Sequence, residues 1–164
     1  MVRPEVLFLL AASTAMADPQ PAIASFNQWC FKAGQTAAQI ESNIQSALTE
    51  PATFTLTFWD DSLEPRPIDA PKGVERRCSI EFDGDHTTLA IDALRQQMAT
   101  PPTFGTPIPL PDTHHVGDAT ALIEGRELLR GRVAVVEVGT RANGTRTFMS
   151  VDRLYDGLGL PEKG

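Results

Sequence analysis

Two stretches of the sequence alternate strictly between apolar and polar residues, and this pattern limits the fold more than any other feature. Residues 53–59 alternate threonine with phenylalanine and leucine, and residues 76–82 place a cysteine, an isoleucine and a phenylalanine at every second position. Because a strand points successive side chains to opposite faces, each stretch predicts a strand with one buried face. The threonines favour an antiparallel sheet with one solvated side.

Further strand patterns lie nearer the carboxyl end, at residues 119–124, 132–138 and 145–151. Asn143 and Gly144 separate the last two strands, and this dipeptide is typical of a β-hairpin turn.

Three segments have the apolar spacing of helices: residues 25–33, 36–50 and 85–100. Ser25 and Thr36 each precede a glutamine by three residues, which is the pattern of a capping box. Prolines follow the second and third segments and would end them. The order of elements predicts a single α+β domain over residues 18–164, with an antiparallel sheet of about five strands and three helices packed on one face.

Two proline-rich stretches fall between these elements. Residues 60–73 combine three prolines with several acidic residues and are predicted to form a loop. Residues 101–113 hold five prolines, and we expect a stiff, polyproline-like connector there.

The first 17 residues have the layout of a secretory signal peptide. Arg3 precedes a short apolar run at residues 6–12, and Ala15 and Ala17 occupy the positions that a signal peptidase reads. We therefore expect cleavage before Asp18 and a periplasmic or secreted protein. The apolar run is shorter than the roughly 20 residues of a membrane-spanning helix, and no later stretch could span a bilayer.

Export bears on the two cysteines, Cys30 and Cys78. Oxidising compartments preserve disulfides, so we expect these two residues to be joined. Without export, both would be ordinary buried thiols. A redox-active pair usually has the spacing C-x-x-C, which this sequence lacks.

The net charge of −7 argues against a nucleic-acid partner or an anionic membrane surface, because both require a basic footprint. The sequence also lacks the short motifs of nucleotide-binding proteins, zinc proteases, α/β-hydrolases and EF-hands. We expect no resident cofactor and no metal.

Two clusters could nevertheless support catalysis. Asp60 and Asp61 belong to an acidic loop that also carries Glu64 and Asp69, and paired carboxylates suit glycoside hydrolysis or calcium binding. His86 follows two aspartates and could act as a base, although the same residues commonly begin a helix.

A third cluster contains two adjacent histidines. His114 and His115 lie close to Asp112 and Asp118, but this spacing matches no usual zinc pattern. We expect an exposed polar loop rather than a metal site.

The carboxyl-terminal strands are basic within an acidic protein. Arginine favours the recognition of carboxylates and phosphates, so this segment could bind an anionic partner. Charges on hairpin strands can equally protect a sheet edge. The candidate binding residues are Arg126, Arg130, Arg132, Arg141 and Arg146.

Residues 26–30 (Phe-Asn-Gln-Trp-Cys), Trp59 and residues 77–80 (Arg-Cys-Ser-Ile) together resemble a group of small uncharacterised exported bacterial proteins with two cysteines. The resemblance extends over residues 25–100. It implies a secreted, disulfide-bonded domain and assigns no catalytic residue or substrate.

The sequence therefore favours an exported domain that binds an envelope protein or a small anionic ligand. The alternatives are an exported hydrolase that uses the carboxylates of the 60–69 loop or His86, and a structural envelope protein without a ligand. The arrangement in space separates these hypotheses: catalysis requires a pocket that gathers His86 with a carboxylate and a hydroxyl, whereas binding requires arginines that converge in a groove.

Overall fold

A computed structural model describes residues 18–48, 51–58 and 71–155. The predicted signal peptide, Trp59, Asp60 and Asp61 lie outside these residues. The elements in chain order are α1 (Gln20–Trp29), α2 (Ala37–Ala47), β1 (Ala52–Phe58), β2 (Val74–Asp83), α3 (Thr87–Ala99), β3 (Gly105–Ile108), β4 (Thr120–Leu128), β5 (Arg132–Arg141), the short 3₁₀ turn η1 (Ala142–Gly144) and β6 (Arg146–Leu154).

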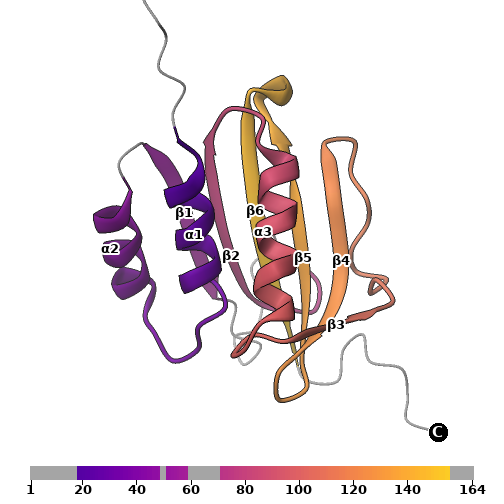
Figure 1. Cartoon of the computed structure of the whole chain (residues 1–164). Coiled ribbons are helices and arrows are strands. Elements are labelled where there is room, and N and C mark those ends of the chain that lie inside the picture. The colour runs from indigo at the N-terminus through magenta and orange to yellow at the C-terminus, as the bar shows by residue number, and fades with distance from the viewer. Residues whose placement is uncertain (1–17, 49–50, 59–70, 156–164) are drawn as a thin grey trace, which may run out of the picture.

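The strands form one antiparallel open sheet in the order β1-β2-β6-β5-β4-β3 (Figure 1). After β2 the chain crosses through α3 to the far edge of the sheet. It then returns as a meander from β3 to β6, and β6 pairs with β2. This long-range pairing brings the carboxyl-terminal strand beside the amino-terminal half of the protein.

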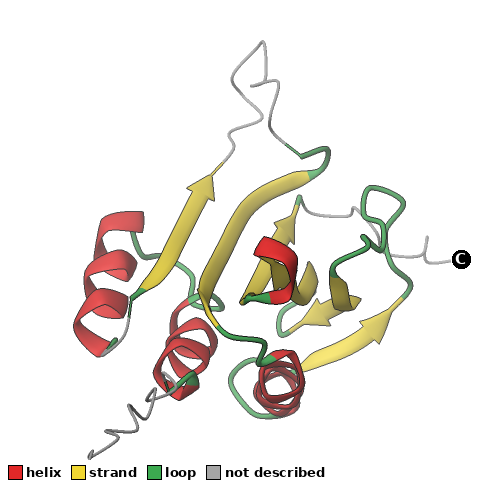
Figure 2. Cartoon of the chain, turned by 90° about the horizontal axis from the view of Figure 1, so that it is seen from above, coloured by secondary structure: helices red, strands yellow, loops and turns green. Residues whose placement is uncertain are grey.

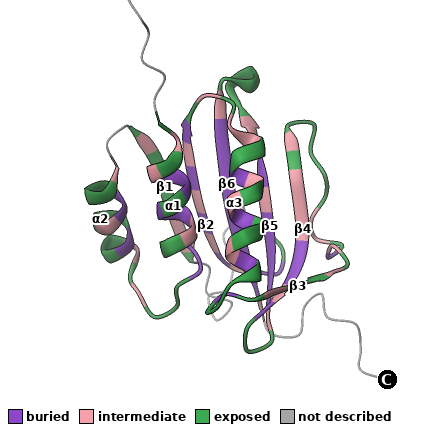
Figure 3. Cartoon of the chain, viewed as in Figure 1, coloured by how far each residue is buried: buried purple, intermediate pink, exposed green. Residues whose placement is uncertain are grey.

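The three helices lie on one side of the sheet, as Figure 2 shows. The predicted α+β class and helical layer are therefore confirmed. The buried sides of the helices face the sheet (Figure 3), and apolar residues of both layers form the main core. Its largest fully buried side chains include Phe26, Ile40, Ile44, Leu94, Met98 and Met149.

The expected disulfide between Cys30 and Cys78 is present, with an S–S distance of 2.03 Å. It joins the residue after α1 to the middle of β2. Both cysteines are fully buried in the main core, so the bond ties the helical layer directly to the sheet.

The sheet has six strands because residues 105–108, expected to be part of a polyproline-like connector, form β3 and pair with β4. Pro107 has no N–H to donate, but β3 is an edge strand, where a proline costs little. The connector prediction is therefore wrong for these four residues.

The first helix also differs from its prediction. Ser25 does not begin α1: it is buried in the middle of the helix, which starts five residues earlier at Gln20. Pro19 and Pro21 are compatible with a helix start, because the first turn leaves its N–H groups without partners in the helix. The Asp18 carboxylate accepts a hydrogen bond from the Gln20 N–H, at 3.0 Å.

The face of the sheet opposite the helices is only partly solvated. Thr53 and Thr55 are exposed there, as predicted. A second, smaller core nevertheless forms on this face from Val74, Val133, Val135 and Leu154, with Ile108, Leu110 and Ile123 packed against it. The segment after β3 therefore lies against the sheet.

Candidate functional site

A groove of about 980 Å³ is bordered by α1, α3 and the turn between β4 and β5. The two helices lie side by side in front of the sheet (Figure 1), and their carboxyl ends both point toward the turn. Asn27 of α1 donates a hydrogen bond from Nδ2 to the carbonyl oxygen of Ala93 in α3, at 3.1 Å. This contact fixes the two walls relative to each other, and the volume is in the upper part of the range for small-molecule sites.

Positive charge is concentrated at the end of the groove next to the β4–β5 turn. The basic residues that line it are Lys32, Arg130, Arg132 and Arg153, from the loop after α1, the turn, β5 and β6. No aspartate or glutamate is among the described residues that line the groove. A surface of this sign is unexpected for a protein whose net charge is −7.

Arg76 adds a fifth positive charge close to this end of the groove. Its side chain is buried, and it donates hydrogen bonds to the carbonyl oxygens of Cys30 and, at 2.7 Å, Lys32. Burial, together with the neighbouring charges of Arg153 and Arg132, lowers the pKa of Arg76 to about 10. The guanidinium groups are therefore close enough to repel one another.

Few negative charges from the part of the chain that the structure describes offset this cluster. Glu75 accepts two hydrogen bonds from Arg153, at 2.9 and 2.6 Å. The carboxyl ends of α1 and α3 each contribute about half an elementary negative charge. Among the described residues, these contributions amount to roughly two negative charges against five cations, which leaves a surplus of positive charge at this end of the groove.

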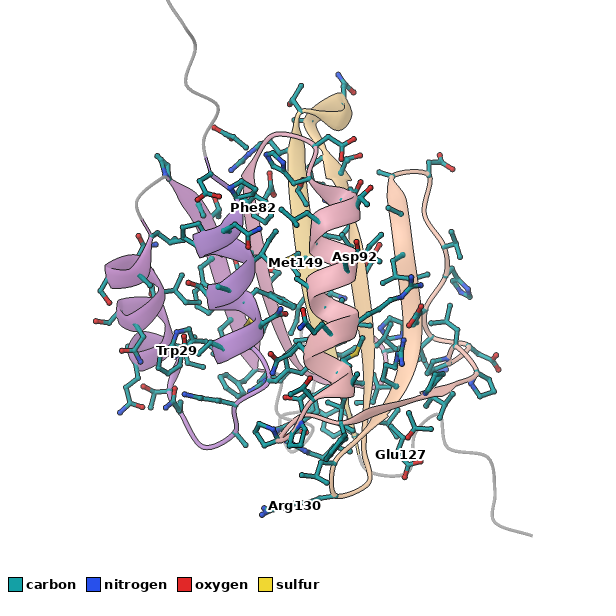
Figure 4. The ribbon with its side chains drawn as sticks, viewed as in Figure 1. Trp29, Phe82, Asp92, Glu127, Arg130 and Met149 are labelled. Carbon is teal, nitrogen blue, oxygen red and sulfur yellow. A yellow bond between two sulfur atoms is a disulfide. The ribbon has the colours of Figure 1, made fainter. Side chains whose placement is uncertain are left out.

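Arg130 occupies the tip of the β4–β5 turn and extends into solvent (Figure 4). Its φ angle of 70° lies in the left-handed region, which glycine or asparagine normally occupies in turns. An arginine in this conformation carries backbone strain of roughly 1 kcal/mol. Positive φ angles also occur at Gly131 in this turn and at Ala142 in the β5–β6 turn, so the conformation follows from the geometry of hairpin turns.

Three of the five predicted binding arginines lie outside the groove and are engaged elsewhere. Arg126 pairs with Glu124 and donates to the Gly105 carbonyl oxygen. Arg141 lies over the Phe148 ring, 3.6 Å from its centroid. The remaining one, Arg146, forms ion pairs with Glu81 and Asp83, at 2.8 and 3.1 Å.

Of the five predicted arginines, Arg130 and Arg132 line the groove. Lys32 and Arg153, which were not predicted, line it as well. Lys32 gave no sequence signal beyond its charge. Arg153 belongs to the basic carboxyl-terminal segment, but only the pairing of β6 with β2 brings it near Arg76. A basic segment therefore indicated the chemistry of the site without fixing its members.

The structure does not complete the predicted catalytic cluster within the described residues. His86 precedes the first turn of α3, and its ring stacks on Phe82, with 6.2 Å between the centroids. The Asp85 carboxylate accepts hydrogen bonds from the Thr87 N–H and hydroxyl, which lower its pKa. Asp85 thus serves the start of the helix. Catalysis by His86, Asp60 or Asp61 stays a prediction.

Residues 112–118 form a largely exposed loop, as expected, but the His114 side chain is mostly covered. Its Nε2 lies 3.0 Å from Oδ2 of Asp152 and its Nδ1 lies 2.9 Å from the Thr113 hydroxyl. Packing of Leu110 on the second core brings this segment onto the sheet and leaves the histidine side chain 10% exposed. His115 is exposed, and the described residues contain no cluster of three or more metal-ligating side chains.

Asp152 is the buried centre of this arrangement. Burial alone would raise the pKa of its carboxyl group, but hydrogen bonds from Arg77 and His114 outweigh it and hold the pKa below the usual value. Arg77 donates two of these bonds, at 2.7 and 2.6 Å. The network joins β2 and β6 to the segment after β3. Its role is therefore structural.

No protein-family model, curated protein or solved structure matches this chain. Within the part of the chain that the structure describes, no helix is long and apolar enough to cross a membrane.

Proposed function

We propose that this chain is an exported binding protein that captures an anionic ligand in the groove between α1 and α3. The carrying observation is that Lys32, Arg130, Arg132 and Arg153 all line one cavity whose described lining has no acidic residue. Arginine forms strong, charge-assisted hydrogen bonds with carboxylates and phosphates. A concave site of this size suits a small ligand better than the flat surface of a folded envelope protein.

The composition of the groove favours binding over catalysis. Its described lining contains arginine, lysine, carboxamides, threonines and apolar side chains, but no histidine, cysteine or carboxylate. Arginine is always charged near neutral pH and is a poor proton acceptor. The groove therefore offers strong anion contacts without the acid–base pair that hydrolysis usually requires.

Export supports this proposal. The signal-peptide layout of the first 17 residues and the disulfide between Cys30 and Cys78 are both typical of a protein that works in an oxidising compartment. We place the protein in the periplasm or outside the cell, where it would meet its ligand.

The test uses 8-anilinonaphthalene-1-sulfonate, a fluorescent probe with an apolar body and one sulfonate. The protein is titrated as wild type, as Arg130→Gln/Arg132→Gln, and as Arg95→Gln/Arg141→Gln, which removes the same charge outside the groove lining. We expect the groove variant to bind the probe about tenfold more weakly. The control variant should bind like the wild type. Equal affinity of all three proteins would refute the proposal.

A further inference from the structure

We propose that the ligand is a short extended peptide, which lies between α1 and α3 with its terminal carboxylate at the basic end of the groove. This inference rests on the proposed function, because it assigns the same arginines to one end of a longer ligand. It adds a second set of contacts, made by carboxamide side chains along the two helices.

Carboxamides from both helices line the groove. Gln20 and Gln28 lie on α1, and Gln96 and Gln97 lie on α3. Gln97 donates to the Thr103 hydroxyl, at 3.1 Å. The side chains of the other three form no hydrogen bond with any described residue, and all three are exposed. They are therefore available to a ligand.

The chemistry of these side chains matches a peptide backbone. A carboxamide donates and accepts hydrogen bonds at the same time, and each peptide unit presents one N–H and one C=O group. Asn27, which joins the helices, also leaves its Oδ1 atom buried without a hydrogen-bond partner among the described residues. A ligand N–H that reached this oxygen would remove an unfavourable feature of the free protein.

Apolar residues of the lining favour a peptide over a sugar. Leu129 is exposed in the groove and can contact aliphatic side chains of a ligand, while Ile23, Phe31 and Leu128 form its buried apolar floor. A sugar has hydroxyl groups over most of its surface, and hydroxyls against these residues would lose hydrogen bonds to water without replacement. A peptide has a polar backbone for the carboxamides and can carry apolar side chains for the apolar residues, so it suits both kinds of lining.

The dimensions of the groove suit a peptide of about three residues. The lining from Ala93 to Thr100 follows α3 for about 10 Å at a rise of ~1.5 Å per residue. An extended peptide advances about 3.3 Å per residue, so about three residues fit along the helix. The terminal carboxylate then lies near Lys32, Arg130 and Arg132, beyond the ends of both helices.

The experiment displaces the fluorescent probe from the groove with N-acetyl-Leu-Ala-Leu, its carboxamide form, acetate and inorganic phosphate. We expect the free-acid peptide to displace the probe about tenfold more effectively than the amide form or either small anion. Equal displacement by the two peptide forms, or stronger displacement by phosphate, would overturn the peptide assignment.

A variant pair separates this inference from the proposed function. Gln28→Ala/Gln96→Ala removes groove carboxamides, and Gln45→Ala on the exposed side of α2 is the matched control. We expect the groove variant to bind the peptide about tenfold more weakly, to lose much less of its affinity for the probe, and to melt like the wild type. Unchanged peptide affinity, or equal loss of probe and peptide, contradicts the inference. Probe binding that still requires Arg130 and Arg132 would leave the proposed function intact.

Discussion

Asn27 in α1 donates a hydrogen bond to the carbonyl oxygen of Ala93 in α3, and this is the polar contact that joins the two walls of the groove. The donor and acceptor are 66 residues apart in the sequence. The carbonyl oxygen belongs to a residue of the second turn of α3. This hydrogen bond adds to the packing of both helices on the main core and bridges the two walls of the groove directly.

Replacing Asn27 by alanine should lower the free energy of unfolding by about 1 kcal/mol, the usual contribution of one neutral hydrogen bond. It should also weaken probe binding, because the walls are no longer held at a fixed separation. Urea denaturation measures the first effect and fluorescence titration the second. Gln28→Ala, at the next position of α1, is the control and should leave the free energy of unfolding unchanged. A similar loss of stability in both variants would show that the effect is not specific to the Asn27 contact.

The conformation of Arg130 predicts a trade-off between stability and binding. Arg130→Asn places a residue that tolerates positive φ at this turn, so it should raise the free energy of unfolding by about 0.5–1 kcal/mol. The same change removes a groove cation and should weaken probe binding.

Ala142→Asn is the control for this prediction, because Ala142 has a φ angle of 49° in the turn between β5 and β6, away from the groove. It should stabilise the protein to a similar extent with unchanged probe affinity. An Arg130→Asn protein that is more stable and still binds the probe at wild-type strength would contradict the role of Arg130.

The disulfide should contribute a large share of the stability. Cys30 and Cys78 are 48 residues apart, and the chain-entropy model gives about 4 kcal/mol for closing a loop of that length. Cys30→Ala/Cys78→Ala should therefore lower the urea midpoint of unfolding strongly. A reductant should shift the wild-type midpoint in the same direction and leave the variant unchanged. A wild-type midpoint that does not respond to reductant would argue against this contribution.

The Asp152 network predicts a defined dependence of stability on pH. The carboxyl group has a lowered pKa in the folded protein and an ordinary pKa, about 3.9, in the unfolded chain. Its stabilisation is therefore fully present above pH ~5 and is lost as the pH falls below 4 through the lowered value. Asp152→Asn lacks this contribution at every pH.

We expect Asp152→Asn to cost about 2 kcal/mol at pH 7, which is less than for a fully buried ion pair because the Arg77 side chain is 41% exposed and can turn to water. The difference from the wild type should shrink between pH 4 and pH 2. Urea unfolding at a series of pH values measures it, and a difference that stays constant over this range would be inconsistent with the proposed ionisation.

The sequence predicted local structure well where one pattern decided it. The alternation in residues 53–59 and 76–82 predicted β1 and β2, and the Thr36 capping box is present, with the Thr36 N–H donating to Gln39 and the Gln39 N–H donating to Thr36. Asn143 and Gly144 form the hairpin turn with positive φ angles. In each case neighbouring residues are sufficient to determine the conformation.

The groove could not be predicted in the same way. Its charge depends on Lys32, Arg132 and Arg153, which come together only because β6 pairs with both β2 and β5. The strand β3 was missed because Pro107 counts against a strand unless the strand is known to lie at an edge. Both features depend on the order of the strands, which local patterns do not contain.

An amide chemical-shift map of the ¹⁵N-labelled protein during titration with 8-anilinonaphthalene-1-sulfonate tests the central claim most directly. We expect the largest shifts in α1, the loop at Phe31 and Lys32, the carboxyl end of α3 and residues 128–132. Thr53, Thr55 and the Asp152 network on the opposite face of the sheet should hardly change. Shifts concentrated on that opposite face, or spread evenly over the protein, would contradict a binding site in the groove.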